Sequence, residues 1–214
     1  MRRDLNGSWT GGLFGWRDPT AIRKVLDGTL GRVADTGVRG WVKLNYKTTE
    51  PLILLGQLPV ESYEYVFLIR MSGPHALFVG EEAGAAEALI QRAGLGVGIF
   101  QPRVHIEKLV TNLAEKPDDR FLMGAVFARI EGFGNSLRTI SLWGADVADA
   151  EMFHRIRHNL APYRVELRDV ATGTQLLSIS SRGEVVFIYD GPRALDAVDQ
   201  TLKTLSKDGY VEWP

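Results

Sequence analysis

Residues 175–205, QLLSISSRGEVVFIYDGPRALDAVDQTLKTL, carry the pattern that decides the fold. Two runs rich in β-branched and aromatic residues, 175–181 and 184–189, flank the dipeptide Arg182-Gly183. Short runs of this kind on either side of a glycine turn are typical of a β-hairpin. This stretch therefore predicts two antiparallel strands.

A helix is predicted directly after this hairpin. Pro192 stands at a position that is favoured in the first turn of a helix, and Asp208-Gly209 ends the pattern. Apolar residues recur every three or four positions in between, which predicts a helix over 192–207 with one buried stripe. The stripe consists of Leu195, Val198, Leu202 and Leu205.

The same order of elements occurs 110 residues earlier in the chain. This shift aligns residues 67–69 with 177–179, Gly73 with Gly183, and 77–79 with 187–189. The fold class is therefore expected to be α+β, with mainly antiparallel sheets in two ββα-like halves. An internal duplication of ferredoxin-like halves is one interpretation of the alignment. Chance is the other, because strand, glycine turn, strand and helix form a common order.

The remaining elements follow from periodicity and from breaking residues. Residues 7–16 are expected to be a glycine-rich loop anchored by aromatic side chains, and a short helix is expected after Asp18-Pro19. Period-two patterns predict strands, and periods near 3.6 predict helices. The strands are expected at 42–46, 63–70, 76–79, 121–130, 137–143 and 163–167, and the helices at 81–93, 102–113 and 146–160.

The best candidate for a domain boundary is Lys116-Pro117-Asp118-Asp119, which is polar and contains proline. We expect an N-terminal loop and short helix over 1–36, a first α+β unit over 37–116 and a second over 117–214. A single compact domain is the alternative, because 214 residues fit either arrangement.

Composition excludes several classes of protein. The chain has no cysteine, which excludes disulfides, a thiol nucleophile and cysteine-ligated metals. The N-terminus lacks the apolar run of a signal peptide, and no run approaches the roughly 20 residues that span a bilayer. We therefore expect a cytoplasmic protein that does not enter membranes. The net charge of −1 argues against a surface that is uniformly basic. No cofactor is predicted.

One helix carries residues that could hold a metal ion. Glu151, His154 and His158 are three and four positions apart, so they share one face of the predicted helix. A carboxylate and two imidazoles are competent ligands for zinc or non-haem iron. The three residues point away from the apolar face of that helix, and Arg155 beside them opposes a cation. A solvated or partner-facing helix is the alternative interpretation.

Asp35-Thr36-Gly37 matches the tripeptide of aspartic proteases. Their mechanism needs two such aspartates sharing a proton. The resemblance to retroviral-type proteases ends with this tripeptide and Gly56, which follows too closely to leave room for a flap. We interpret the tripeptide as a turn that leads into a strand.

A second candidate site is cationic. Arg164 and Arg168 fall on the polar side of their predicted strand, and the preceding helix exposes Arg155 together with His154 and His158. Arginine suits bidentate contact with phosphate, and Tyr163 or Trp143 could stack on a base. We predict that these residues bind an anionic partner. A mixed-charge solvated surface is the alternative, because Glu151, Glu166 and Asp169 interleave with the cations.

Three classes of function follow, in this order. The first is a non-catalytic binding or regulatory component, because no convergent catalytic set is found. Its partner would be a protein or a second copy of the chain, with nucleic acid as the next possibility. The second is a nucleic-acid-processing protein of ferredoxin-like repeats, which the order of strands and helices resembles in outline. The third is a metal-dependent hydrolase that uses Glu151, His154 and His158.

Overall fold

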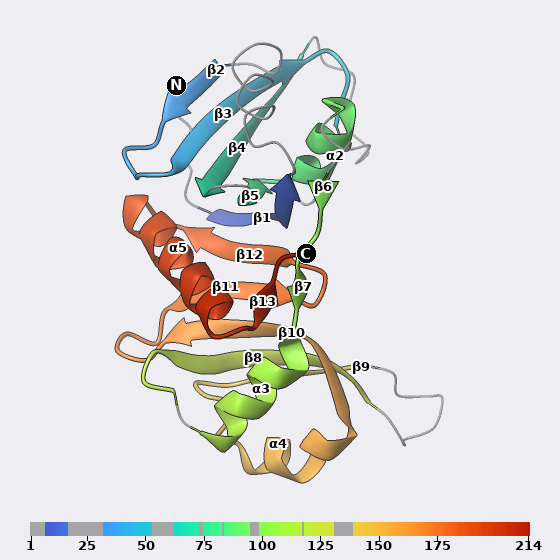
Figure 1. The fold of residues 1–214 in the computed structure, drawn as a ribbon, viewed down its shortest axis with the longest axis vertical. Helices are drawn as coiled ribbons and strands as arrows, with labels where there is room; N and C mark the ends of the chain where they lie inside the picture. The colour runs from blue at the N-terminus through green and yellow to red at the C-terminus, as the bar shows by residue number, and fades with distance from the viewer. Residues whose placement is uncertain are drawn as a thin grey trace. The chain divides into compact units, whose positions relative to one another are not determined.

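The computed structural model describes residues 7–16, 32–52, 62–72, 75–82, 84–94, 99–116, 118–130 and 139–214 (Figure 1). The chain forms two compact units. Unit 1 comprises residues 1–102, 183–196 and 213–214, and unit 2 comprises residues 103–182 and 197–212. Helices combine with mostly antiparallel strands in both units, so the expected α+β class is confirmed. The boundaries at residues 36 and 116 stay a prediction.

Unit 1 is built on an antiparallel sheet with the order β2-β3-β4-β5-β1-β12, and β6 also pairs with β1. The expected strand at 42–46 and the hairpin of 63–70 with 76–79 are confirmed, while its turn residues 73–74 lie outside the described residues. The strands are β1 (Gly7–Trp16), β2 (Arg32–Asp35), β3 (Trp41–Thr48), β4 (Tyr63–Ser72), β5 (His75–Gly80), β6 (Ile99–Phe100) and β12 (Glu184–Tyr189).

Strand β1 corrects the expectation of a glycine-rich loop. It runs through the sheet between β5 and β12. Its glycines allow close packing, because a Cβ at Gly11 would collide with the carbonyl oxygen of Phe78 and a Cβ at Gly15 with the ring of Phe100. Glycine within a strand often marks such an approach. From the sequence alone the same residues are indistinguishable from a loop. The helix expected after Asp18 lies outside the described residues.

Helix α2 (Ala85–Arg92) packs against β1 and β5. It begins later than the expected residue 81 and ends, as expected, before Gly94, which has a positive φ of 66°. Glycine adopts this conformation without the strain that a Cβ imposes. The apolar core that α2 forms with the sheet contains Leu44, Phe67, Ile69, Phe78, Leu89 and Ile90.

His75, at the start of β5, lies among aromatic rings. Its ring centroid is 3.9 Å from that of Trp213 and 6.3 Å from that of Phe100. The Nδ1 atom is buried without a hydrogen-bond partner among the described residues. Burial, and then the positive charge of Arg70, lower the pKa of His75. The folded chain therefore favours the neutral imidazole.

Unit 2 contains an antiparallel sheet with the order β11-β10-β8-β9 (Figure 1). The hairpin expected from residues 121–143 is confirmed as β8 and β9, and its turn, 131–138, lies outside the described residues. A short pair, β7 with β13, is separate from this sheet. The strands are β7 (Arg103–Val104), β8 (Phe121–Ile130), β9 (Thr139–Trp143), β10 (Leu160–Asp169), β11 (Gln175–Ser180) and β13 (Val211–Glu212).

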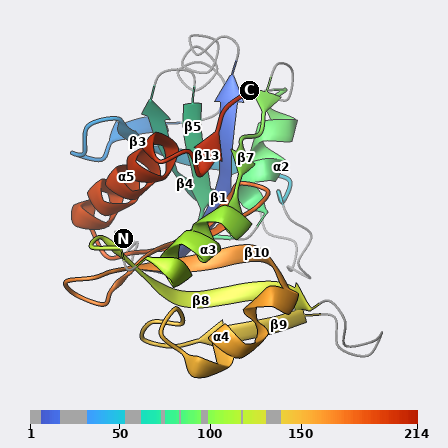
Figure 2. The ribbon, with the colours of Figure 1, turned by 60° about the horizontal axis from the view of Figure 1, so that its bottom comes forward.

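Helix α3 (Ile106–Glu115) packs against β10 and β8 in unit 2 (Figures 1 and 2). The expected helical spacing of its apolar residues is confirmed. The helix begins at residue 106 and not at the expected residue 102, because Arg103 and Val104 belong to β7. Its buried side chains are Ile106, Leu109, Val110 and Leu113.

The helix expected over 146–160 is shorter than predicted. Helix α4 spans Glu151–Ile156, a 3-10 turn follows over Arg157–Asn159, and β10 begins at Leu160. Asp146, the first residue of the expected helix, does not cap α4, whose N-cap position is Ala150. The Asp146 carboxylate accepts hydrogen bonds from the N–H groups of Met123 (3.2 Å) and Ala148 (3.0 Å), so it fastens the preceding loop to β8.

Helix α5 (Pro192–Lys207) has the bounds that the sequence predicts. The expected stripe is buried, with 0–4% of each side chain exposed: Leu195, Val198, Leu202 and Leu205. Gly209, which ends the pattern, has a φ of 69°. The prediction from apolar periodicity is therefore confirmed for this helix.

Candidate functional site

Among the described residues of unit 2, helix α3 packs against one face of the sheet, through β8 and β10. Along β10, Val165 and Leu167 are fully buried on the side of α3. Successive side chains of a strand point to opposite faces, so Arg164, Glu166 and Arg168 lie on the other side. We call this side the open face.

Strand register identifies the neighbours of Arg164 on the open face. Arg164 lies opposite Phe127 of β8, and Phe127 lies opposite Ser141 of β9. Residues that are directly opposite in an antiparallel pair share a face. The open face of β8, β9 and β10 therefore comprises Ala125, Phe127, Arg129, Thr139, Ser141, Trp143, Arg164, Glu166 and Arg168.

Two aromatic rings form a platform on this face. The ring centroids of Phe127 and Trp143 are 5.1 Å apart with an interplanar angle of 82°, an edge-to-face contact. Trp143 lies directly opposite Ala125, which is small and fully buried. Even so, 62% of Trp143 is exposed. We refer to Phe127 and Trp143 as the aromatic platform.

Polar and cationic groups border the platform. Arg129 is exposed and lies opposite Thr139, while Ser141 is exposed beside Phe127. Arg164 is half-buried on the other side of Phe127. An aromatic surface is thus framed by guanidinium and hydroxyl groups, a combination that can stack on a planar ring and hold a nearby anion.

The Glu166–Arg168 pair has a structural role on the same face. The Nε atom of Arg168 donates a hydrogen bond to Oε1 of Glu166 at 2.9 Å. Glu166 is 7% exposed and Arg168 is 28% exposed. The pair occupies space that Gly124 leaves free, since a Cβ there would meet Oε1 of Glu166 at 2.7 Å. This carboxylate is therefore neutralised within the fold.

The predicted anion-binding residues fall into two separate groups. Helix α4 lies on the side of α3, because Phe153 and His158 line a hollow of about 190 Å³ together with Val110 and Thr111 of α3. Arg164 and Arg168 lie on the open face. The structure does not bring Arg155, His154 and His158 together with these two arginines.

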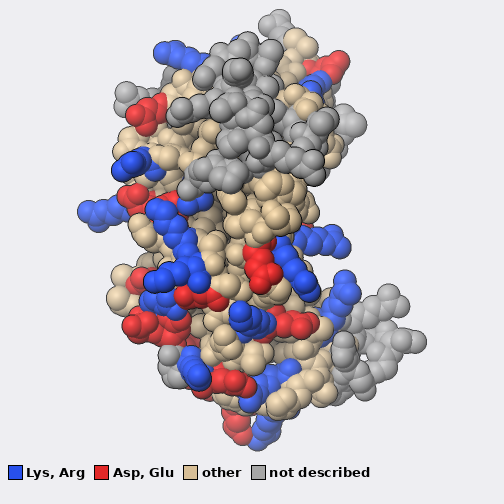
Figure 3. Space-filling model, viewed as in Figure 1, with Lys and Arg blue, Asp and Glu red and all other residues tan. Residues whose placement is uncertain are grey.

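The group on α4 is solvated and internally paired. Arg155 forms an ion pair with Glu151 one turn earlier, and both are exposed. His154 and His158 are also exposed, whereas Phe153 is buried. Over α3 and α4 the basic and acidic side chains interleave (Figure 3). This surface has the mixed charge that the alternative interpretation expects.

No three His, Asp or Glu side chains within the described ranges are arranged to hold a metal ion. Glu151, His154 and His158 are all described, and they do not form such a group. A 3-10 turn begins at Arg157, so the regular helical spacing ends before His158. Zinc or iron binding by these residues stays a prediction.

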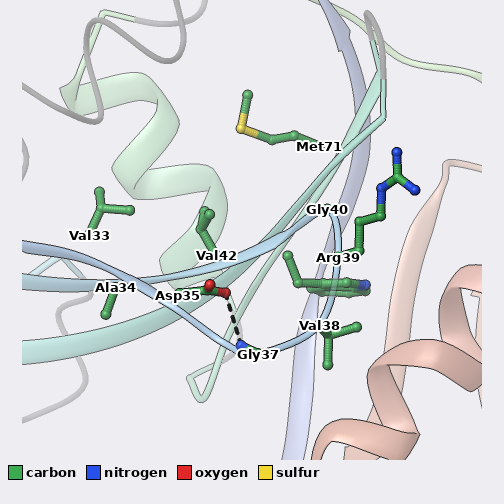
Figure 4. A pocket seen from close by; sticks show the side chains of 10 residues that line it. Val33, Ala34, Asp35, Gly37, Val38, Arg39, Gly40, Val42 and Met71 are labelled. Carbon is green, nitrogen blue, oxygen red and sulfur yellow. Dashed lines mark hydrogen bonds between the residues drawn. The ribbon is translucent and has the colours of Figure 1, made fainter.

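Asp35 lines a hollow of about 720 Å³ at the turn between β2 and β3, together with Val38, Trp41 and Met71 (Figure 4). Its Oδ1 accepts a hydrogen bond from the N–H of Gly37 at 2.9 Å. Gly37 has a φ of 78°, which favours glycine. The tripeptide is thus a turn that leads into a strand, as the sequence was interpreted.

Among these residues the sequence points to Trp143 and Arg164, but not to Phe127, Arg129, Thr139 or Ser141. The alternation of Thr139, Ser141 and Trp143 with Ile140 and Leu142 is visible in the sequence and could have identified one polar face. The register that sets β8 between β9 and β10 is not visible there.

No protein-family model matches the chain, and no curated protein matches its sequence. In the described part of the chain, no helix combines the length and the apolar character needed to span a bilayer.

Proposed function

We propose that this protein is a non-catalytic binding component whose partner is a single-stranded nucleic acid. The single observation that carries the proposal is the aromatic platform, with Trp143 62% exposed on a sheet face beside Arg129 and Arg164. Bases stack on exposed aromatic rings, and nearby arginines hold the phosphates that link them.

A nucleic acid suits this face better than a broad protein interface. The core of a protein interface is a contiguous apolar patch. The large exposed apolar residues of unit 2 are instead scattered among its described residues: Trp143 on β9, Met152 on α4, and Val170 after β10. Around the platform the exposed neighbours are Arg129, Thr139 and Ser141. A single aromatic pair in polar surroundings favours a planar, charged ligand.

The partner is expected to be single-stranded. Base faces are open to stacking only where the bases are unpaired. A duplex would offer the platform only its phosphates, and Arg129 and Arg164 provide few contacts for a backbone-only mode. We therefore expect stacking that tolerates different sequences, with moderate affinity and a shallow dependence on salt.

The decisive experiment compares two exposed apolar residues of unit 2 by fluorescence anisotropy with a labelled single-stranded oligonucleotide. Trp143→Ala should weaken binding by about 5- to 150-fold, because stacking on one aromatic contributes about 1–3 kcal/mol per base. Met152→Ala is the matched control, since Met152 is 61% exposed but lies on α4. This variant should bind like the unmodified protein.

Two results would contradict the proposal. One is flat anisotropy of the unmodified protein at the lowest salt, with single strands and duplexes alike; a protein partner would then be the better hypothesis. The other is an equal effect of Trp143→Ala and Met152→Ala.

Four further expectations stay predictions: the internal duplication, the ferredoxin-like halves, the cytoplasmic location and the metal-dependent hydrolase. The described residues add no support for the hydrolase.

A further inference from the structure

Strand β9 lies at one end of the sheet of unit 2, as β2 lies at one end of the sheet of unit 1, and the two strands differ in how their edges are protected. An exposed edge strand offers unpaired N–H and C=O groups, and proteins usually blunt it with charges or proline. β2, Arg32–Asp35, has a charge at each end. β9, Thr139–Trp143, has the sequence TISLW, without charge or proline. Among the described residues, only β8 pairs with β9.

The outward backbone groups of β9 can be identified. The N–H of Gly144, just after β9, donates to the carbonyl oxygen of Gly124 at 3.0 Å, so it points toward β8. Backbone groups of successive residues in a strand point in opposite directions. The N–H and C=O groups of Thr139, Ser141 and Trp143 therefore point away from β8, toward the free edge.

We propose that β9 pairs with β9 of a second copy of this chain, antiparallel and centred on Ser141. A twofold axis at Ser141 places it opposite its own copy and places Thr139 opposite the partner's Trp143. All six outward groups of each strand then find partners, because residues of these three pairs exchange both of their hydrogen bonds. This inference does not depend on the proposed function.

Both faces of the joined strands are complementary in this register. On the side of α3, Ile140 lies opposite the partner's Leu142, and both are half-buried apolar residues with surface left to cover. On the open face, the row across the junction reads Ala125, Trp143, the partner's Thr139 and the partner's Arg129. The backbone of the partner's Arg129 lies two strand spacings, about 9.6 Å, from that of Trp143. An arginine side chain is long enough for its guanidinium to reach the Trp143 ring from there.

A second copy fits this edge better than an unrelated peptide, because the complementarity is that of the strand with itself. The contact is small, so we expect a weak dimer that forms with rising concentration; interfaces below about 1,200 Å² belong to the transient class. The dimer would join two aromatic platforms into one sheet face.

Cysteine scanning tests the register directly, because the chain contains no cysteine. In the proposed dimer the two Cα atoms of position 141 are about 5.5 Å apart, within the range of a disulfide. Those of position 139 are about 14 Å apart, since four residues of offset separate them. Under mild oxidation, Ser141→Cys should give at least about fivefold more disulfide-linked dimer than Thr139→Cys. Equal yields would overturn the proposal.

Sedimentation of the full chain over a hundredfold concentration range provides the second test. Ser141→Pro removes only an outward N–H, which an edge strand tolerates, and should abolish the dimer. Ser141→Thr retains that group and should dimerise normally. If Ser141→Pro loses its native circular dichroism, Ser141→Lys replaces it, since two lysines opposite each other repel. A protein that stays monomeric throughout, or a dimer that Ser141→Pro and Ser141→Lys leave intact, would refute this interface.

Discussion

The two faces of the unit 2 sheet are made by the same strands but differ in exposure at β9 and the adjoining part of β8. On the face toward α3, Met123, Val126, Val165 and Leu167 are all fully buried. On the open face, Trp143 remains mostly exposed beside Arg129 and Ser141. Apolar burial stabilises the fold, whereas a large exposed aromatic contributes little to it. The comparison shows that burial on the face toward α3 maintains the structure, whereas Trp143 leaves a large aromatic surface exposed on the other face.

The largest expected effect comes from the covered face. Leu167→Ala should lower the free energy of unfolding by about 2–5 kcal/mol, because it removes buried methyl groups and leaves a cavity. Trp143→Ala on the open face should change it by less than about 1 kcal/mol. Urea denaturation of both variants measures the difference. Equal losses of unfolding free energy in the two variants would mean that the open face stabilises the fold as much as the covered face does.

A smaller effect is expected from the buried ion pair on the open face. Glu166→Ala leaves Arg168 without its partner in a partly buried place and should cost about 1–3 kcal/mol of unfolding free energy. Glu151→Ala removes the corresponding partner of Arg155, an exposed pair, and should have almost no effect. A larger loss of unfolding free energy in Glu151→Ala than in Glu166→Ala would contradict the structural role that we assign to Glu166.

The smallest expected effect is the pH dependence of stability that His75 contributes. His75 is part of an aromatic cluster, and burial together with Arg70 lowers its pKa from 6.5. The unfolded chain thus binds a proton more readily, so stability is fully present above pH 6.5 and falls as the pH drops toward the folded pKa. His75→Gln should reduce this fall in thermal unfolding between about pH 7 and 5. An unchanged profile for His75→Gln would contradict the assignment.

Much of the fold could be predicted from the sequence because it depends on local periodicity. The stripe of Leu195, Val198, Leu202 and Leu205 predicted α5 correctly, and alternation predicted the hairpins. Strand β1 was missed because its glycines serve contacts with Phe78 and Phe100, which are distant in sequence. Helix α4 was overextended because Asp146 bonds to β8 and not to the helix.

The candidate site could be predicted only in part, for a related reason. Trp143 and Arg164 stand out as residue types, but their common face depends on the register of β8 between β9 and β10. The grouping of Arg155 with Arg164 assumed that a helix and the next strand expose their polar sides together. Here α4 lies on the side of α3, so that grouping does not occur.

The central claim is that the open face of unit 2 is the side that contacts nucleic acid. Photo-crosslinking tests it most directly: a single-stranded oligonucleotide with a photoreactive base is irradiated with the protein, and the modified residues are identified by mass spectrometry. We expect adducts on Trp143 and on the peptide 121–129, which contains Phe127. Adducts confined to 151–158, the exposed side of α4, would contradict the claim and would return the anion-binding role to His154, Arg155 and His158.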